Sequence, residues 1–339
     1  MATLTACSVI DENLNDCGKQ AEMDYELRLV TNMNTEIKTQ LTTDADLKLN
    51  QELRTHLGSV FTDFAHDVDL SFYDTQGDSL RLQHDEHFMD ANQASYELNL
   101  PMRHYMHLAT ANILDNELVT LEDDERCHHS SLRQVDRDTI DSHSTGIFTA
   151  RQPMEILEGV DQNFNVRLYM ANCAAMLVID PRGYDPSGMQ VYSTGFATGF
   201  NICDSSYVYS EKSPIVKTTV LGEMDGNEEV GFCSVTFPSK NEHGTRTVIE
   251  TEEPFVADED EEGLWEFQVY VPVQDEVETR GPKSITRNRL RIRRPLKPGQ
   301  LMIIRGWLAD KGVVQTDDYN VGVSVTLDWN KRSEEDVPL

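Results

Sequence analysis

The chain has 339 residues, of which 39% are hydrophobic and 8% aromatic, and its formal net charge is −30 at pH 7. This length suits two domains of ordinary size, each able to bury enough surface to fold, and no apolar run approaches the length that spans a bilayer. The excess of carboxylates repels phosphate backbones and anionic lipid headgroups, so the composition disfavours nucleic-acid binding and electrostatic attachment to membranes.

A four-residue motif near the N-terminus indicates a covalent route to a membrane. Leu4, Thr5, Ala6 and Cys7 match the pattern that a bacterial lipoprotein signal peptidase requires, with a small residue before a cysteine that carries diacylglycerol. Lipid chains on Cys7 would hold the protein at a membrane, because each buried methylene contributes about 0.8 kcal/mol. No charged region or apolar core of a signal peptide precedes the motif, so we expect the sequence to begin close to the processing site. The alternative is an ordinary N-terminal tail with a free thiol.

The next part of the chain predicts one helix among strands. Apolar residues alternate with polar ones over residues 23–29, which is the period of a strand with one buried face. An apolar stripe at helical spacing then predicts a helix near residues 46–65. The stripe consists of Leu53, Leu57, Val60, Phe61 and Phe64.

Turn-forming residues then separate shorter apolar runs. Residues 68–72 and 80–82 flank a turn at 74–77 and predict a hairpin. Residues 96–100 and 105–109 predict a second strand pair, in which Pro101 closes its strand because proline has no backbone N–H to donate. The many charges and weak apolar periodicity of residues 115–145 predict a long surface excursion.

Strands without a convincing helix follow, and we place the domain boundary near residues 155–163. The expected strands cover residues 164–168, 176–179, 216–220, 231–237, 245–249, 264–271, 290–292, 301–304 and 321–329. Two antiparallel sandwiches account for this spacing. The predicted organisation is an anchor and linker over residues 1–22, domains over 23–160 and 161–332, and a tail over 333–339.

The candidate metal sites and catalytic motifs are weak. His84 and His87 lack the HExxH order, and on a strand their imidazoles would face opposite sides, so we interpret them as surface histidines in a loop. Cys127, His128 and His129 with His143 form a possible zinc set, but adjacent ligands rarely converge on one ion. The acidic run at residues 258–263 lacks a glutamate at the last position of a calcium loop. No nucleophile or nucleotide-binding motif occurs, so the sequence predicts no enzyme, no metal site and no cofactor.

The cysteines do not suggest a disulfide scaffold. The chain has six cysteines and no CxxC pair, and an odd number remains when Cys7 is set aside. A full disulfide framework is therefore not expected.

A basic stripe stands out in this acidic chain. Arg289, Arg291 and Arg293 alternate with Leu290 and Ile292, which places three guanidinium groups on one face of a strand and the apolar pair on the other. One interpretation is a solvated face that prevents aggregation between strand edges. The other is a docking strip for an acidic partner subunit.

The order of these segments resembles the FimB-type minor fimbrial subunits that anchor the type V pili of Bacteroidales. The most specific match is Cys7 followed by an acidic segment that ends at Cys17. Looser matches cover residues 60–74, 98–108, 166–172 and 321–330.

This resemblance implies two tandem transthyretin-like antiparallel β-sandwich domains, with the helix in the N-terminal domain. It also implies a non-enzymatic, surface-exposed outer-membrane lipoprotein, tied by the lipid on Cys7, which anchors a fimbrial polymer used in adhesion and can limit its length. Its partner would be a fimbrial stalk subunit, joined by β-strand donation. The candidate strand for donation contains Val321, Val323, Val325, Leu327 and Trp329. The alternative for this strand is that it completes its own sandwich.

A second function fits the same anchor and fold, namely a lipid-anchored glycan-binding protein of a nutrient-uptake system. Such a protein exposes aromatic side chains as platforms for sugar rings. Only Trp265, Trp307 and Trp329 are available, and all three lie in strand-like patterns that favour the core.

Overall fold

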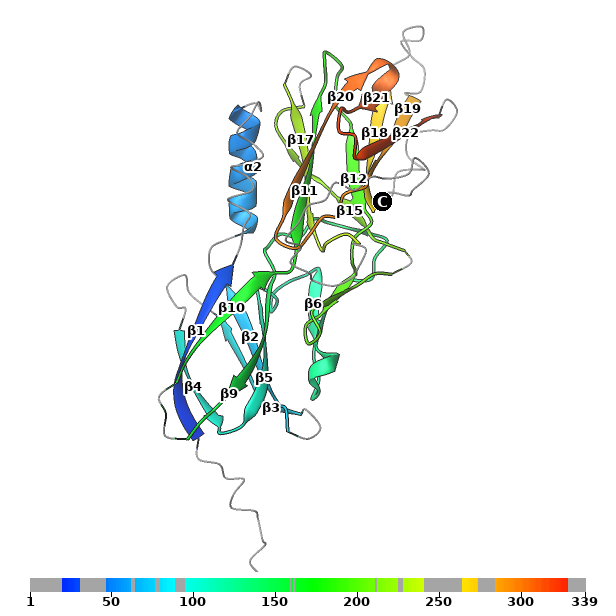
Figure 1. Ribbon diagram of the computed structural model, residues 1–339. Helices are drawn as coiled ribbons and strands as arrows, with labels where there is room; N and C mark the ends of the chain where they lie inside the picture. Colours follow the sequence, from blue (N-terminus) through cyan, green and yellow to red (C-terminus); the bar gives the residue numbers. More distant parts are fainter. Residues whose placement is uncertain are drawn as a thin grey trace, which may run out of the picture.

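The structure, a computed structural model, describes residues 20–30, 47–61, 65–76, 80–88, 95–158, 160, 162–210, 212–224, 228–240, 264–273 and 284–328. Over these residues the chain is mainly β, with four sheets and one α-helix (Figure 1). The mainly β prediction is therefore confirmed. The described helix is too short and too polar to span a membrane.

A seven-stranded sheet forms one end of the molecule, in the order β3-β2-β5-β9-β10-β1-β4 (Figure 1). Its strands are β1 (Gln20–Val30), β2 (Asp67–Asp74), β3 (Arg81–Phe88), β4 (Ser95–Pro101), β5 (His104–Ala111), β9 (Phe148–Glu155) and β10 (Asn163–Met170). Strands β2 and β3 form the predicted hairpin. Only β1 and β10 run parallel, over seven paired residues from Asp24↔Asn163 to Val30↔Tyr169.

The predicted pairing of residues 96–100 with 105–109 is wrong, although both strands exist. β4 pairs with β1, whereas β5 lies between β2 and β9. Only Met102 and Arg103 separate the two strands, so the sheet curls and brings the end of β4 to the start of β5 across a common core. Leu100 and Tyr105 both belong to that core, and the Tyr105 hydroxyl donates a hydrogen bond to the carbonyl oxygen of Pro101.

Two further sheets pack face to face at the other end of the molecule. The five-stranded sheet has the order β16-β17-β11-β20-β21, and the six-stranded sheet has the order β22-β19-β18-β12-β15-β8. The first contains β11 (Cys173–Asp180), β16 (Thr219–Leu221), β17 (Val230–Thr236), β20 (Leu301–Ala309) and β21 (Val313–Gln315). The second contains β8 (Thr139–Ile140), β12 (Gln190–Thr194), β15 (Ile215–Lys217), β18 (Trp265–Val273), β19 (Ser284–Ile292) and β22 (Val321–Asp328). Their facing side chains, including Leu177, Phe232 and Leu290, form one core.

Helix α2 (Leu47–Val60) covers the other face of the five-stranded sheet (Figure 1). Its buried side chains Leu49, Leu53 and Leu57 share a cluster with Met176 and Val178 of β11. The Glu52 carboxylate also accepts a hydrogen bond of 2.6 Å from the backbone N–H of Gly222. The helix is therefore not packed on N-terminal strands alone: its cluster also contains Val68 and Leu70 of β2, and it joins these to strands that follow residue 170.

Residues 115–145 are not a surface excursion. They contribute β6 (Val119–Glu122), β7 (Ser131–Gln134) and β8, and their strands β6 and β7 pair within a four-stranded sheet of order β14-β13-β7-β6. The other strands of that sheet are β13 (Gly199–Asn201) and β14 (Ser206–Val208). Val119, Leu132 and Ile140 are buried, but their strands are too short to show a period in the sequence.

The sheets also connect the two residue ranges that the sequence analysis assigns to separate domains. The seven-stranded sheet extends past residue 160, because β10 lies between β1 and β9. The four-stranded sheet combines β7 with β13, and β8 pairs with β15.

Candidate functional site

The proposed lipidation motif of Leu4, Thr5, Ala6 and Cys7 lies outside the described residues, as do Trp329, the strand expected at 245–249 and the acidic run at 258–263. The other predicted docking residues lie on β19 and β22 of the six-stranded sheet, except Arg293, which directly follows β19.

The candidate docking strand β22 forms one edge of that sheet. It runs antiparallel to β19 of the same chain, from Val321↔Ile292 to Asp328↔Ile285. Val321 is buried, whereas Val323 and Val325 are each 38% exposed. The side chain of Leu327 is not among those described. Within the described part of the chain, the outer edge of β22 has no neighbouring strand, so its backbone can accept one more.

The basic stripe is partly neutralised by a carboxylate on the neighbouring strand. Glu266 of β18 is only 8% exposed, and its Oε1 accepts a hydrogen bond of 2.9 Å from Arg289 Nη2. Arg289 Nε lies 3.1 Å from both carboxylate oxygens, and Arg291 Nε lies 3.9 Å from Oε2. Arg293 follows the end of β19, where its backbone N–H donates to the carbonyl oxygen of Asn320. Two of the three guanidinium groups therefore converge on one buried charge.

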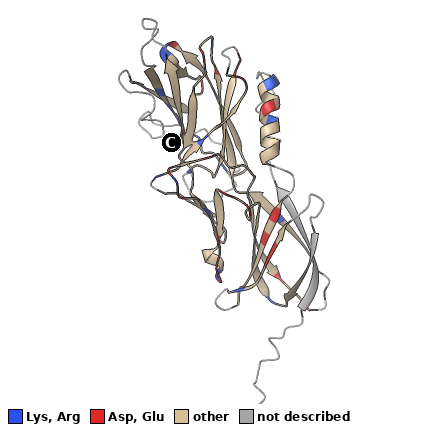
Figure 2. Cartoon of the chain, turned by 180° about the vertical axis from the view of Figure 1, so that it is seen from behind, with Lys and Arg blue, Asp and Glu red and all other residues tan. Residues whose placement is uncertain are grey.

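The apolar face of β19 is buried, as the sequence analysis predicts. Leu290 and Ile292 are fully buried, as their alternation with the arginines predicts. Elsewhere among the described residues, Lys and Arg positions are scattered singly over the chain (Figure 2).

Trp307 lines a pocket of about 450 Å³ on the five-stranded sheet. The Arg182 guanidinium carbon lies 4.2 Å from the centroid of the Trp307 ring, a cation–π contact, and the indole Nε1 donates to Gln315 Oε1. The full lining is Asp180, Arg182, Glu229, Ile303, Arg305, Gly306, Trp307, Asp317 and Asp318. Trp265, in contrast, is buried in the core, as its pattern predicts.

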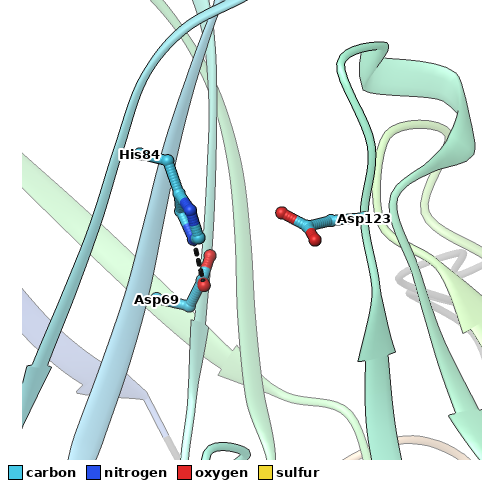
Figure 3. A group of neighbouring side chains, drawn as sticks. All are labelled: Asp69, His84 and Asp123. Atoms are coloured by element: carbon cyan, nitrogen blue, oxygen red, sulfur yellow. Dashed lines mark hydrogen bonds and ion pairs between the residues drawn. The ribbon is translucent and has the colours of Figure 1, made fainter.

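A separate cluster joins the β2–β3 hairpin to the segment that follows β6. Asp69, His84 and Asp123 place their potential ligand atoms within 4.8 Å of one another. Figure 3 shows the Asp123 carboxylate turned toward the His84 and Asp69 pair from the opposite side. His84 Nε2 lies 2.5 Å from Asp69 Oδ2, and Arg81 forms an ion pair with Asp123. Burial raises the pKa of Asp69, and the hydrogen bond with His84 opposes this shift.

This cluster escaped sequence reasoning. His84 lies in strand β3 and not in a loop, while the prediction that His84 and His87 face opposite sides agrees with their register opposite Ser71 and Val68. The sequence offers a clue to Asp69, because this charged residue alternates with buried apolar residues of β2. The sequence offers no clue to Asp123, because this residue lies far from Asp69 and His84 along the chain.

The cysteine and histidine set of the sequence analysis does not converge. The Cys127 thiol interacts with Cys203, and this contact, with burial, raises the pKa of Cys127. His129 forms an ion pair with Asp124. His143 is buried against Gln134, at 3.2 Å from its side-chain oxygen, and desolvation lowers its pKa to about 4.

Comparison with known proteins identifies a shared fold. No family model and no curated protein matches the sequence. A solved structure of an adhesin candidate from Bacteroides ovatus superposes with a TM-score of 0.51 at 11% identity, covering 97% of this chain and 100% of the other. A candidate polysaccharide-binding protein from Bacteroides thetaiotaomicron gives a TM-score of 0.51 at 9% identity, covering 89% and 97%.

The fimbrial anchor protein Mfa2 from Porphyromonas gingivalis is also similar, with a TM-score of 0.47 at 10% identity and coverage of 91% and 97%. At such identities the likeness concerns the fold. The chain therefore has a mainly β fold that it shares with adhesin candidates of Bacteroides, as the resemblance noted from the sequence implies.

Proposed function

We propose that this chain is a surface-exposed outer-membrane lipoprotein that anchors a fimbrial polymer for adhesion and has no catalytic activity. The lipid on Cys7 would hold it at the membrane, and a fimbrial stalk subunit would join it by β-strand donation. The observation that carries this proposal is the fold shared with adhesin candidates, combined with the position of β22, the last strand described, at the edge of a sheet.

The proposed contact is an added strand on the outer edge of β22. Main-chain hydrogen bonds give such a contact its strength, and alternate side chains give it specificity. Val323 and Val325 are exposed on β22 and separated by one residue, so both lie on the same face of the strand and can pack against an incoming strand. Arg291 and Arg293 lie beside this edge and would attract an acidic partner subunit.

Lipid attachment is tested by labelling cells with an alkynyl palmitate and comparing the wild type with Cys7→Ala. We expect label on the wild-type protein, no label on the variant, and a fimbrial polymer that co-purifies with the wild type from the outer membrane. Label that persists in Cys7→Ala contradicts the assigned cysteine, and a wild type without label contradicts the anchor.

The strand edge is tested separately with the double variant Val323→Lys/Val325→Lys. Two charges at these partly exposed edge positions should reduce recovery of the polymer at least tenfold, while lipid labelling stays unchanged. Val220→Lys is a matched control, because Val220 is 44% exposed on β16 at the edge of another sheet. Equal recovery with the double variant and the control contradicts the proposed edge.

Charge reversal of Arg291 and Arg293 tests the basic stripe in the same assay. If recovery of the polymer does not change, the stripe is a solvated face and not a docking strip.

The Trp307 pocket favours a second function, glycan binding by a lipid-anchored protein of a nutrient-uptake system. The pocket combines an aromatic ring with carboxylate and guanidinium groups, which can hydrogen-bond sugar hydroxyls. Arg182 covers the ring and would have to move aside for a sugar to stack. One structure of similar fold is itself described as a candidate polysaccharide-binding protein.

Titration with a panel of host and plant oligosaccharides distinguishes the two functions. Glycan binding that is lost in Trp307→Ala, with a polysaccharide-uptake complex co-purifying in place of a polymer, would favour the second function over the first.

A further inference from the structure

The cluster of Asp69, His84 and Asp123 has the composition of a metal site. One imidazole and two carboxylates supply three ligand atoms, all within 4.8 Å of one another. They come from two strands of the seven-stranded sheet and from the segment after β6, and they face one another across a short gap (Figure 3). An ion at about 2 Å from each ligand would require only small side-chain rotations.

The backbone holds these three residues in place. Asp69 pairs with Glu86 and Ser71 with His84 in the β2–β3 ladder, so Asp69 and His84 share one face of the hairpin. The segment after β6 is tied to the start of β3 by the bridge between Leu80 and Arg126 and by a hydrogen bond of 2.8 Å from the Arg81 N–H to the Glu125 carbonyl oxygen. The ligands are therefore positioned before an ion arrives, which lowers the entropic cost of binding.

The charges around the cluster favour a cation. Asp69, Asp123 and Glu86 contribute three carboxylates, and Glu86 Oε1 lies 3.9 Å from His84 Nε2. Arg81 supplies one positive charge through its ion pair with Asp123. The Asp69 side chain is only 5% exposed, so water does little to stabilise its charge.

A buried polar atom adds an independent observation. The Ser71 hydroxyl oxygen is buried and interacts only weakly with the Tyr73 hydroxyl, which hydrogen-bonds to Ser130 at 2.6 Å. Because Ser71 lies opposite His84 in the ladder, its side chain points to the same face as the cluster. A metal-bound water would give this hydroxyl a stronger partner.

We propose that Asp69, His84 and Asp123 bind one divalent first-row transition-metal ion of the Zn²⁺ type. Imidazole favours Zn²⁺ and its neighbours over Ca²⁺, which prefers oxygen ligands alone. Binding replaces the hydrogen bond between His84 and Asp69 with two bonds to the ion. The ion would then connect the seven-stranded sheet to the four-stranded sheet and stabilise their junction. This site is independent of the proposed fimbrial function.

The test is calorimetric titration of the full-length chain, without an affinity tag and after chelation with EDTA, with ZnCl₂ at pH 7. We expect one site per chain that is weakened at least tenfold by His84→Gln and by Asp123→Asn. His104→Gln is the matched control, because His104 also neighbours a carboxylate, Glu155 at 3.7 Å, but lies outside the cluster. A thermal unfolding scan should show that Zn²⁺ raises the Tm of the wild type and of the control only.

The variants keep the side-chain volumes, and circular dichroism before titration confirms that each is folded. Wild-type protein that binds no Zn²⁺ overturns the proposal. So does binding that is equally strong in His84→Gln and the wild type, which would assign the ion to other residues. Stronger binding of CaCl₂ than of ZnCl₂ would overturn the assignment to a transition metal.

Discussion

Glu266 is the residue on which two arginines of the candidate docking strip depend. Its side chain is 11% exposed, while Arg289 is 52% exposed, so the pair combines a buried anion with a half-solvated cation. We expect Glu266→Gln to lower the free energy of unfolding by about 1–3 kcal/mol, because it weakens a charge-assisted, two-pronged hydrogen bond. Urea unfolding measures this loss, and a double-mutant cycle with Arg289→Gln isolates the contribution of the pair.

A solvated ion pair provides the control. Lys212 and Asp138 are each 78% exposed and form an ion pair that water screens. Asp138→Asn should leave the unfolding curve unchanged. A loss as large as that of Glu266→Gln would contradict the importance of burial at Glu266.

The stability of the protein should depend on pH, because two of its histidines are buried. His107 and His143 are fully buried, and desolvation lowers the pKa of each to about 4 from 6.5. Between these values the unfolded chain binds protons that the folded chain does not, so stability is complete above pH 6.5 and falls as the pH decreases toward 4. At pH 5 the loss is about 2 kcal/mol for each histidine.

Urea unfolding between pH 5 and 8 measures this dependence. His143→Gln should reduce the pH dependence of the unfolding free energy by the contribution of one histidine. Equal slopes in the wild type and His143→Gln would show that His143 is not kept neutral in the folded protein.

At the residue scale, the sequence reveals which side of a strand is buried but not which charges meet. Leu290 and Ile292 are predictable because alternation is a local property of one strand. The convergence of Arg289 and Arg291 on Glu266 depends on the register between β18 and β19, which no local pattern encodes. Trp307 has the pattern of a core residue, yet it lines a pocket on the five-stranded sheet.

At the scale of elements, helix α2 owes its place to one apolar stripe. Leu53 is fully buried in a cluster that includes Met176 and Val178. We expect Leu53→Ala to lower the free energy of unfolding by about 2–5 kcal/mol, because the deletion leaves a cavity between the helix and the five-stranded sheet. Arg54→Ala is the control, since Arg54 is exposed outside the buried stripe and its change should have little effect. Similar losses for both variants in urea unfolding would contradict the packing of α2 on this sheet.

The helix was predictable because fourteen residues give a periodic signal, and Leu47–Val60 lies within the expected range of 46–65 but ends earlier. Five short strands were not predictable, because each has two to four residues and an alternating pattern cannot be recognised over so few. These strands are β6, β7, β8, β13 and β14. Strands β4 and β5 were themselves predicted, but their pairing partners were not. Turn residues between neighbouring strands suggest a hairpin, but a two-residue connection can also cross between facing parts of a curled sheet.

At the scale of the whole molecule, the sheets depend on strands from both halves of the chain. β10 joins β1 to β9, so without it the seven-stranded sheet would divide into β3-β2-β5-β9 and a β1-β4 pair. Helix α2 would lose its partner sheet, and β7 would lose β13. The two ranges 23–160 and 161–332 therefore form neither sheet system completely by themselves.

A fragment of residues 1–160 tests this dependence. We expect it to lack a cooperative unfolding transition, because the buried face of α2 and the free edges of β1 and β9 would be exposed to solvent. The full-length chain should show a cooperative transition under the same conditions, with near-ultraviolet circular dichroism and urea as probe and denaturant. Mixing fragment 1–160 with fragment 161–339 should restore the near-ultraviolet signal if β10 inserts between β1 and β9. A cooperative transition in fragment 1–160 alone would instead mean that residues 23–160 form an independent domain and that the pairing of β1 with β10 adds little to its stability.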